Sequence, residues 1–174
     1  MEEYTFETER LGMRPTAVED AHFIFELLNT PKWLRYIGDR QVHTEEDAVT
    51  YIKSKMLPQF KERQFGNYIV IRKEDHHKIG CCGLYDREGL EGIDVGFAFL
   101  PSYEGKGYGY ESTSKLMEYG KDVHGITHVN GITIKENIGS QKLLEKLGLR
   151  YIKTITLPKD PDPLLFYSNS TDHA

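Results

Sequence analysis

The chain has 174 residues, of which 39% are hydrophobic and 28% are charged, and its formal net charge is −5. These values predict one globular domain over residues 1–174, with most of its core between about residues 5 and 167. The acidic balance argues against general affinity for nucleic acid or for an anionic membrane. No apolar run approaches membrane-spanning length, and no signal-peptide pattern opens the chain. We therefore expect a cytoplasmic protein without nucleic-acid or membrane partners.

Hydrophobic periodicity and turn residues predict the secondary structure. In chain order, the patterns predict a strand at 6–14, helices at 16–28 and 44–56, strands at 68–72, 79–85 and 93–100, a helix at 110–123, a strand at 128–134, a helix at 137–147, and strands at 151–157 and 164–167. Thr16 and Thr44 are the expected N-caps of the first two helices, and Thr30-Pro31 is expected to break the chain between them. A proline-rich turn, PKDPDP, is expected between the last two strands. Because strands and helices interleave irregularly, we expect a mixed α/β sheet.

The only two cysteines, Cys81 and Cys82, are adjacent within a predicted strand. Neighbouring strand residues point to opposite faces, which disfavours a disulfide or a shared metal ion. We expect two buried, reduced thiols and no metal site.

Three glycines lie between the predicted strand at 93–100 and the helix that follows it. Residues 105–109 read GKGYG. Glycines leave backbone N–H groups uncovered, and a following helix adds free N–H groups and the positive end of its dipole. The segment therefore predicts a phosphate-binding loop, although a glycine-rich turn without a ligand is the alternative.

Two common phosphate loops do not fit this segment. A Walker loop requires Ser or Thr after Gly-Lys, whereas Gly107 follows Lys106. A dinucleotide loop requires G-x-G-x-x-G and an acidic residue about 20 positions later, and neither is present.

A second segment, residues 131–149, reads GITIKENIGSQKLLEKLGL. Together, the two segments resemble the core of the GNAT acyl-CoA N-acetyltransferases. The loop at 104–109 is similar to the family's Q/R-x-x-G-x-G/A pattern, and Asn137 and Ser140 match its N-x-x-A/S pattern. The opening ETERLGMRP, residues 7–15, resembles the ribosomal-protein, Rim-type branch. The resemblance implies a central mixed, mostly antiparallel sheet that splays in the middle to admit acetyl-CoA and is flanked by helices.

The resemblance also implies the residues that bind acetyl-CoA. They are Phe99, Leu100, Glu104, Gly105, Lys106, Gly107, Tyr108, Gly109, Tyr110, Asn137 and Ser140. The backbone of Phe99 and Leu100 is expected to bond the pantetheine arm, and one N–H there would hold the oxyanion. Asn137 is expected to contact pantetheine or to cap the following helix. Glu104 departs from the family, which usually has Gln or Arg, and a carboxylate there disfavours a neighbouring diphosphate.

Two residues are candidates for proton transfer. Asp94 stands where many family members carry a glutamate base, and a water could relay the proton because Asp is shorter. The alternative for Asp94 is a solvent-facing carboxylate. Ser140 is the candidate acid, because Leu144 occupies the position at which many relatives carry an acidic tyrosine. The alternative for Ser140 is an ordinary serine in the first helical turn.

The expected reaction is direct acetyl transfer to a primary amine in a ternary complex, since the loop has no cysteine for a covalent intermediate. The Rim-type resemblance favours a protein or peptide N-terminal amine as acceptor, near Arg35, Tyr36 and Arg40. A small-molecule amine acceptor and a non-catalytic acyl-CoA-binding module are the alternatives, and a homo-oligomeric state stays open.

Overall fold

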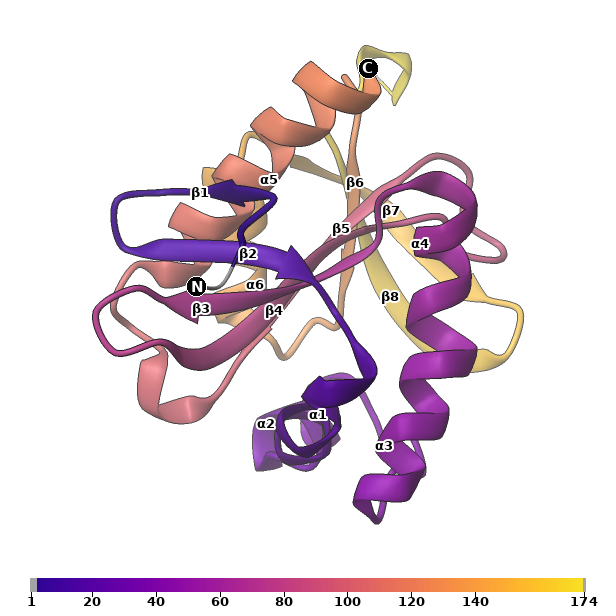
Figure 1. The fold of residues 1–174 in the computed structure, drawn as a ribbon. Helices are drawn as coiled ribbons and strands as arrows, with labels where there is room; N and C mark the ends of the chain where they lie inside the picture. Colours follow the sequence, from indigo (N-terminus) through magenta and orange to yellow (C-terminus); the bar gives the residue numbers. More distant parts are fainter. Residues whose placement is uncertain (1–2, 174) are drawn as a thin grey trace.

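The computed structural model describes residues 3–173, and within them eight strands form one sheet (Figure 1). The strands are β1 Phe6–Glu7, β2 Leu11–Pro15, β3 Asn67–Arg72, β4 His77–Tyr85, β5 Asp94–Phe99, β6 Asn130–Thr133, β7 Arg150–Leu157 and β8 Asp160–Ser168. The spatial order is β1-β2-β3-β4-β5-β6-β8-β7, and only β5 and β6 run parallel. The mixed, mostly antiparallel sheet that the sequence predicted is confirmed.

Helices and short helical turns connect the strands. They are η1 Val18–Asp20, α1 Ala21–Leu28, α2 Pro31–Tyr36, α3 Glu45–Tyr51, η2 Ile52–Met56, α4 Leu57–Arg63, η3 Pro101–Tyr103, α5 Tyr108–His124, α6 Ile138–Lys146 and η4 Thr171–His173. The α3, η2 and α4 segments follow one another as one rod (Figure 1). Among residues 3–173, no helix combines the length and apolar character needed to cross a bilayer.

The sheet opens between β5 and β6. These two strands share one residue pair, Asp94 with Asn130, and the N–H of Asn130 donates to the carbonyl of Ile93 at 2.8 Å. Because pairing stops there, the rest of β5 has an unpaired edge on its β6 side. The glycine loop follows this strand after the short η3 turn, so the fold places it at the wide end of the opening.

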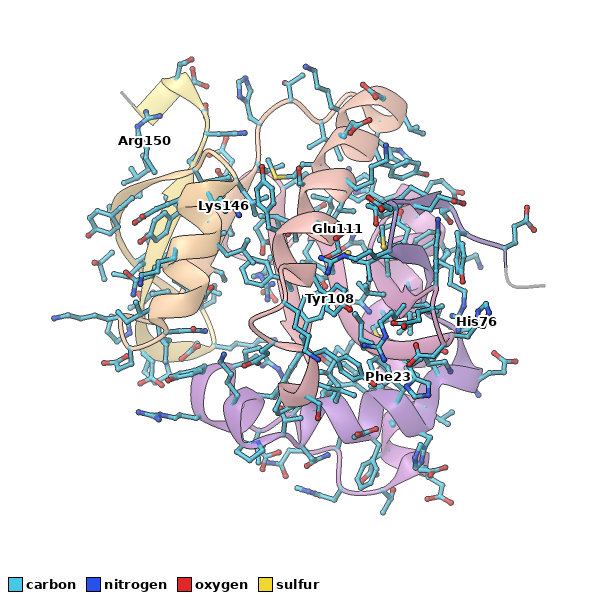
Figure 2. All side chains as sticks on the ribbon, turned by 90° about the vertical axis from the view of Figure 1, so that its left-hand side faces the viewer. Phe23, His76, Tyr108, Glu111, Lys146 and Arg150 are labelled. Atoms are coloured by element: carbon cyan, nitrogen blue, oxygen red, sulfur yellow. The ribbon has the colours of Figure 1, made fainter. Side chains whose placement is uncertain are left out.

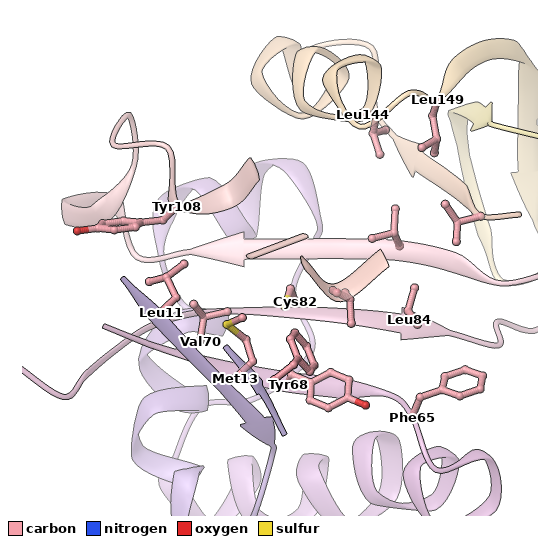
Figure 3. Packing of buried hydrophobic residues seen from close by; sticks show 14 of the residues in the cluster. Leu11, Met13, Phe65, Tyr68, Val70, Cys82, Leu84, Tyr108, Leu144 and Leu149 are labelled. Carbon is pink, nitrogen blue, oxygen red and sulfur yellow. The ribbon is translucent and has the colours of Figure 1, made fainter. Parts of the chain in front are cut away.

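Two hydrophobic clusters hold the faces of the sheet. One packs β2 to β5 against Leu116 of α5, and Figure 3 shows part of it, including Tyr68, Cys82 and Leu84. The other packs α1 and α3 against Ile69, Ile71 and Cys81. Cys81 and Cys82 are therefore free, buried and on opposite faces, as predicted. Burial raises the pKa of the Cys81 thiol to about 12, which keeps it protonated at neutral pH.

Several predicted boundaries in the N-terminal half are wrong. The strand predicted at 6–14 is instead a hairpin of β1 and β2. The chain reverses between them, and the N–H of Thr8 donates to the carbonyl of Leu11 at 2.8 Å across the turn. Thr16 does not cap the first helix, since its hydroxyl donates to the carbonyl of Asn67 and the Asp20 carboxylate accepts from the N–H of Ala17 instead. Thr30 caps α2 and Pro31 is its first residue, so the predicted break is also a helix start.

The helix at Thr44 begins as predicted, with the threonine side chain accepting from Asp47 N, but the rod continues to Arg63. Near the C-terminus, β8 already begins at Asp160. The turn before it is therefore shorter than PKDPDP, and two prolines lie inside the strand. Thr133 ends β6 earlier than predicted, and α5 begins at Tyr108 rather than at Tyr110.

Candidate functional site

A cavity of about 290 Å³ lies where α2, the end of β5, the glycine loop and the start of α6 meet. Its lining residues are Leu27, Thr30, Lys32, Trp33, Tyr36, Ile37, Phe97, Ala98, Phe99, Tyr103, Glu104, Gly105, Gly107, Tyr108, Gly109, Asn137, Gly139, Ser140 and Leu143. The structure thus brings together both segments that the sequence singled out, because Gly105, Gly107 and Gly109 of the loop line the same cavity as Asn137 and Ser140.

The glycines of the loop serve two different needs. Gly105 has φ 73° and Gly107 has φ 84°, a left-handed conformation that favours glycine. Gly107 is also the N-cap position of α5, so the free N–H groups of that helix begin beside the cavity. Gly109 allows close packing, because an added Cβ would lie 3.1 Å from a methyl of Leu143 on α6.

The open edge of β5 offers backbone groups to the cavity, but not those of Leu100. The N–H of Leu100 donates to Ile79 at 2.9 Å, and its carbonyl accepts from the N–H of Tyr103 at 3.0 Å. The prediction that Leu100 offers its backbone to pantetheine is therefore wrong. Backbone groups alternate between the two edges of a strand. Since Leu100 bonds β4, Phe97 and Phe99 direct their N–H and C=O groups toward the opening.

Asn137 and Ser140 lie at the start of α6. Asn137 is the N-cap, and its Oδ1 accepts from the N–H of Ser140 at 3.2 Å. The cap uses only the carbonyl oxygen of the amide, and the Nδ2 group carries two donors of its own. The two roles considered for Asn137 are therefore compatible. Ser140 is half-buried and lines the same wall of the cavity.

Glu104 lines the cavity and is paired. Its Oε2 lies 2.9 Å from Nζ of Lys32, which comes from α2 on the facing wall. The carboxylate that looked unfavourable beside a diphosphate thus has a cation next to it. No motif in the sequence linked Lys32 to the loop, because 72 positions separate the two residues.

Three other predicted loop residues have different surroundings. Tyr108 is buried, with the guanidinium of Arg10 4.3 Å from its ring centre. Lys106 is exposed and does not line the cavity, but its carbonyl accepts from Arg10 Nη2 at 3.1 Å. Tyr110 is 37% exposed and lies against α6, with Lys146 Nζ 4.2 Å from its ring centre. It is not a lining residue either.

Asp94 is buried at the closed end of the opening. Its carboxylate is 1% exposed and accepts from Arg87 at 3.1 and 3.3 Å. It is therefore not the solvent-facing carboxylate of the alternative interpretation. Burial raises the pKa of Asp94 above its usual value, although the Arg87 charge and hydrogen bonds oppose this. Asp94 does not line the cavity, and at about 3.3 Å per residue it lies ~10 Å along β5 from Phe97.

Aromatic and apolar residues of α2 form the wall opposite the loop. Tyr36 lines the cavity, whereas Arg35 stacks on the Tyr36 ring at 5.1 Å and Arg40 lies outside the lining. Trp33, in the same segment, also lines the cavity. Its buried indole Nε1 has no hydrogen-bond partner among the described residues.

The described part of the chain, residues 3–173, has no group of three or more His, Cys, Asp or Glu side chains placed to hold a metal ion.

The chain is similar to known proteins in both sequence and fold. The family model of the acetyltransferase (GNAT) domain matches residues 10–150. The uncharacterised N-acetyltransferase YnaD of Bacillus subtilis (strain 168) is 27% identical over 143 residues, which cover 82% of this chain and 81% of that protein.

Two solved structures show the same fold. The ribosomal-protein-S5-alanine acetyltransferase from Vibrio fischeri superposes with a TM-score of 0.77 at 18% identity, covering 96% of each chain. The aminoglycoside acetyltransferase AAC(6')-Ib in complex with coenzyme A superposes with a TM-score of 0.73 at 17% identity, covering 94% of this chain and 96% of that one.

Proposed function

Since the chain belongs to the acetyltransferase (GNAT) domain family and is an N-acetyltransferase, we propose that it transfers the acetyl group of acetyl-CoA directly to the N-terminal amine of a protein or peptide. The observation that carries the proposal is the cavity itself. It joins a glycine loop, an unpaired strand edge and the start of α6 in one place. The glycine loop suits a diphosphate, the strand edge suits a pantetheine arm, and the start of α6 places a hydroxyl for a leaving thiolate.

Each part of the site has a role in binding. The N–H groups at Gly107 and in the first turn of α5 bind the diphosphate, with the helix dipole behind them. The backbone of Phe97 and Phe99 bonds the pantetheine arm as a neighbouring strand would. The Nδ2 group of Asn137 donates to the same arm while Oδ1 holds the cap.

The transfer moves two protons. The acceptor amine must lose a proton before its lone pair attacks the thioester carbonyl. Because Asp94 lies ~10 Å along β5 from the cavity, we assign that proton to Asp94 through a chain of waters in the opening between β5 and β6. A raised pKa suits this role, because it brings the base closer to the amine, whose pKa is near ~8. A β5 N–H stabilises the negative carbonyl oxygen while the N–C bond forms. As the C–S bond breaks, the Ser140 hydroxyl donates a hydrogen bond to the departing sulfur. The nitrogen, now bonded to the carbonyl carbon, releases its second proton, and a proton from the surrounding water converts the thiolate to the thiol of CoA.

Two observations support the proposed acceptor class, the α2 wall and the names of the relatives. The wall presents Trp33, Tyr36 and Ile37, a surface suited to the apolar parts of a peptide. The fold neighbour from Vibrio fischeri is named for a ribosomal-protein alanine. The second candidate is a small-molecule amine, because another neighbour is named for aminoglycosides.

We place the reaction in the cytoplasm, where buried thiols such as Cys81 and Cys82 stay reduced.

A panel of acceptors tests the proposal. Purified protein is mixed with acetyl-CoA and with peptides that have either a free or a blocked N-terminus, and free thiol is measured. Polyamines, amino acids and aminoglycosides complete the panel. We expect thiol release with the free N-terminal peptides and none with the blocked ones. Release only with a small amine would assign the second function, and no release with any acceptor would contradict both.

A further inference from the structure

Arg10 lies in the turn between β1 and β2, yet it contacts the glycine loop from about a hundred positions away in the sequence. Its Nη2 donates to the carbonyl of Lys106 at 3.1 Å, and its Nε donates to Glu111 Oε2 at 2.7 Å. Its guanidinium also stacks on the Tyr108 ring. One side chain thus holds a loop carbonyl, the first loop aromatic and an acidic residue in the first turn of α5.

The contact with Lys106 fixes the direction of a peptide group. A trans peptide is planar, so its C=O and N–H point in opposite directions. Because the Lys106 carbonyl points at Arg10, the N–H of Gly107 points the other way. Gly107 lines the cavity and Lys106 does not, so the side of this peptide that carries the N–H is the side of the cavity. Arg10 thus sets the orientation of a peptide that lies between left-handed glycines.

The contact with Glu111 reduces the repulsion between this carboxylate and a bound diphosphate. A carboxylate in the first turn stabilises the helix but repels a diphosphate bound at the same terminus. Figure 2 shows Glu111 close to Tyr108 at the start of α5. Its Oε1 accepts from the Thr8 hydroxyl at 2.6 Å, and its Oε2 accepts from Arg10. Burial disfavours the ionised carboxyl, but these bonds outweigh it and the pKa of Glu111 lies below its usual value.

We propose that Arg10 is a positioning residue for acetyl-CoA binding. Arg10 directs the N–H of Gly107 toward the diphosphate and neutralises the charge of Glu111 beside it. The inference rests on the proposed function of the cavity. It adds a residue that lies outside both glycine-containing segments and does not line the cavity. It also gives the β1–β2 hairpin a role in cofactor binding.

Calorimetric titration of CoA into variants tests this role, with pantetheine, which lacks the diphosphate, as a second ligand. Arg10→Met should weaken CoA binding about tenfold, the usual effect of losing a hydrogen bond from a charged group, and leave pantetheine binding unchanged. Arg10→Lys keeps the charge but cannot reach Lys106 and Glu111 as a fork, so it should show nearly the same loss. Arg63→Met is the matched control, because Arg63 forms a surface ion pair with Asp86 away from the loop.

The outcomes separate the role of Arg10 from the function of the cavity. If wild type and Arg10→Met bind CoA equally, the positioning role is overturned and the proposed function stands. Wild-type affinity in Arg10→Lys would overturn the directional part, and that variant carries the test if Arg10→Met does not fold. An equal loss for CoA and pantetheine would show general damage to the site and would also overturn the role. If wild type does not bind CoA, both proposals fall.

Discussion

Lys32 Nζ lies 2.9 Å from Glu104 Oε2, and this ion pair joins helix α2 to the glycine loop at the edge of the cavity. Both side chains are partly exposed, so the pair contributes little to folding. We expect the pair to affect cofactor binding instead, because the ammonium of Lys32 offsets the negative charge that Glu104 places beside the loop.

CoA affinity in variants of this pair tests that interpretation. Glu104→Gln should tighten CoA binding, and Lys32→Met should weaken it, each by about two- to fivefold, as expected for partly exposed charges. In the Glu104→Gln background, Lys32→Met should have a smaller effect if Lys32 mainly neutralises the carboxylate. Calorimetry at low and high salt measures this, with the exposed Lys159→Met as control. Weaker binding by Glu104→Gln would show instead that the carboxylate helps to hold the cofactor.

Asp94→Asn should lower kcat/KM on the order of 10²-fold, because the amine loses its general base. The wild-type rate should fall as pH decreases through the raised pKa of Asp94, since a protonated carboxyl cannot accept the proton. In the variant, the rate should recover partly as pH rises toward the amine pKa of ~8. A pH–rate profile measures both effects. The matched control is Asp122→Asn, an exposed carboxylate on α5, and an unchanged profile in Asp94→Asn would exclude Asp94 as the base.

Ser140→Ala should lower kcat more than it weakens acetyl-CoA binding, because a bond to the departing sulfur strengthens as negative charge develops. If the hydroxyl only serves the first turn of α6, the variant should lose at most about 1 kcal/mol of stability and keep its turnover. Turnover, calorimetric affinity and melting temperature on the same protein distinguish these results. The N-cap should survive in either case, since Asn137 bonds the backbone N–H of Ser140.

Leu144→Tyr would restore the acidic tyrosine that many relatives carry at this position. We do not expect it to restore the turnover of Ser140→Ala. Leu144 is 1% exposed, and its methyl would lie 2.5 Å from a Cβ at Gly131. Figure 3 shows it with Leu149 in the core below α6. A tyrosine at this position would overpack the core.

Asp20 should make folding stability depend on acid pH. It is 1% exposed and pairs with Arg14 and Lys78. Although burial opposes ionisation, these bonds lower its pKa from 3.8 to about 2. Because the folded-state pKa is depressed, the stabilisation is complete above about pH 4 and is lost as pH falls to about 2, at a cost of about 2 kcal/mol.

Urea unfolding of wild type and Asp20→Asn at several pH values measures this contribution. The variant should be less stable near neutral pH and should lose less stability than wild type between about pH 4 and 2. Asp122→Asn, at an exposed position of α5, should stay within about 0.5 kcal/mol of wild type. Parallel acid dependence in wild type and Asp20→Asn would place the titrating group elsewhere.

The sequence predicted the parts of the site that depend on local chemistry. The glycine loop at the start of a helix, the cap at Asn137 and the opposite faces of Cys81 and Cys82 follow from short-range rules, and the structure has all three. The splayed sheet was predicted from the resemblance of two segments to the GNAT family, because the order and spacing of these segments are typical of that family.

The remaining features depend on contacts between distant segments. Nothing near Glu104 in the sequence indicates Lys32, and nothing near Lys106 indicates Arg10, because the packing of α2 and of the β1–β2 hairpin against the loop brings those residues together. The error at Leu100 has the same origin. Its N–H bonds Ile79 of the neighbouring strand, so the register of β4 on β5 decides which backbone groups face the opening.

The central claim is that the glycine loop binds acetyl-CoA, and thermal melts with and without this cosubstrate test it most directly. At a hundredfold excess over Kd, acetyl-CoA should stabilise wild type by about 2.7 kcal/mol. Gly107→Val should abolish the shift, because φ 84° and uncovered N–H groups both require glycine. Gly125→Val is the matched control. It imposes similar strain at φ 67° at the other end of α5 and should lower the melting temperature without removing the acetyl-CoA shift. Stabilisation of wild type by ATP or NAD but not by acetyl-CoA would contradict the account.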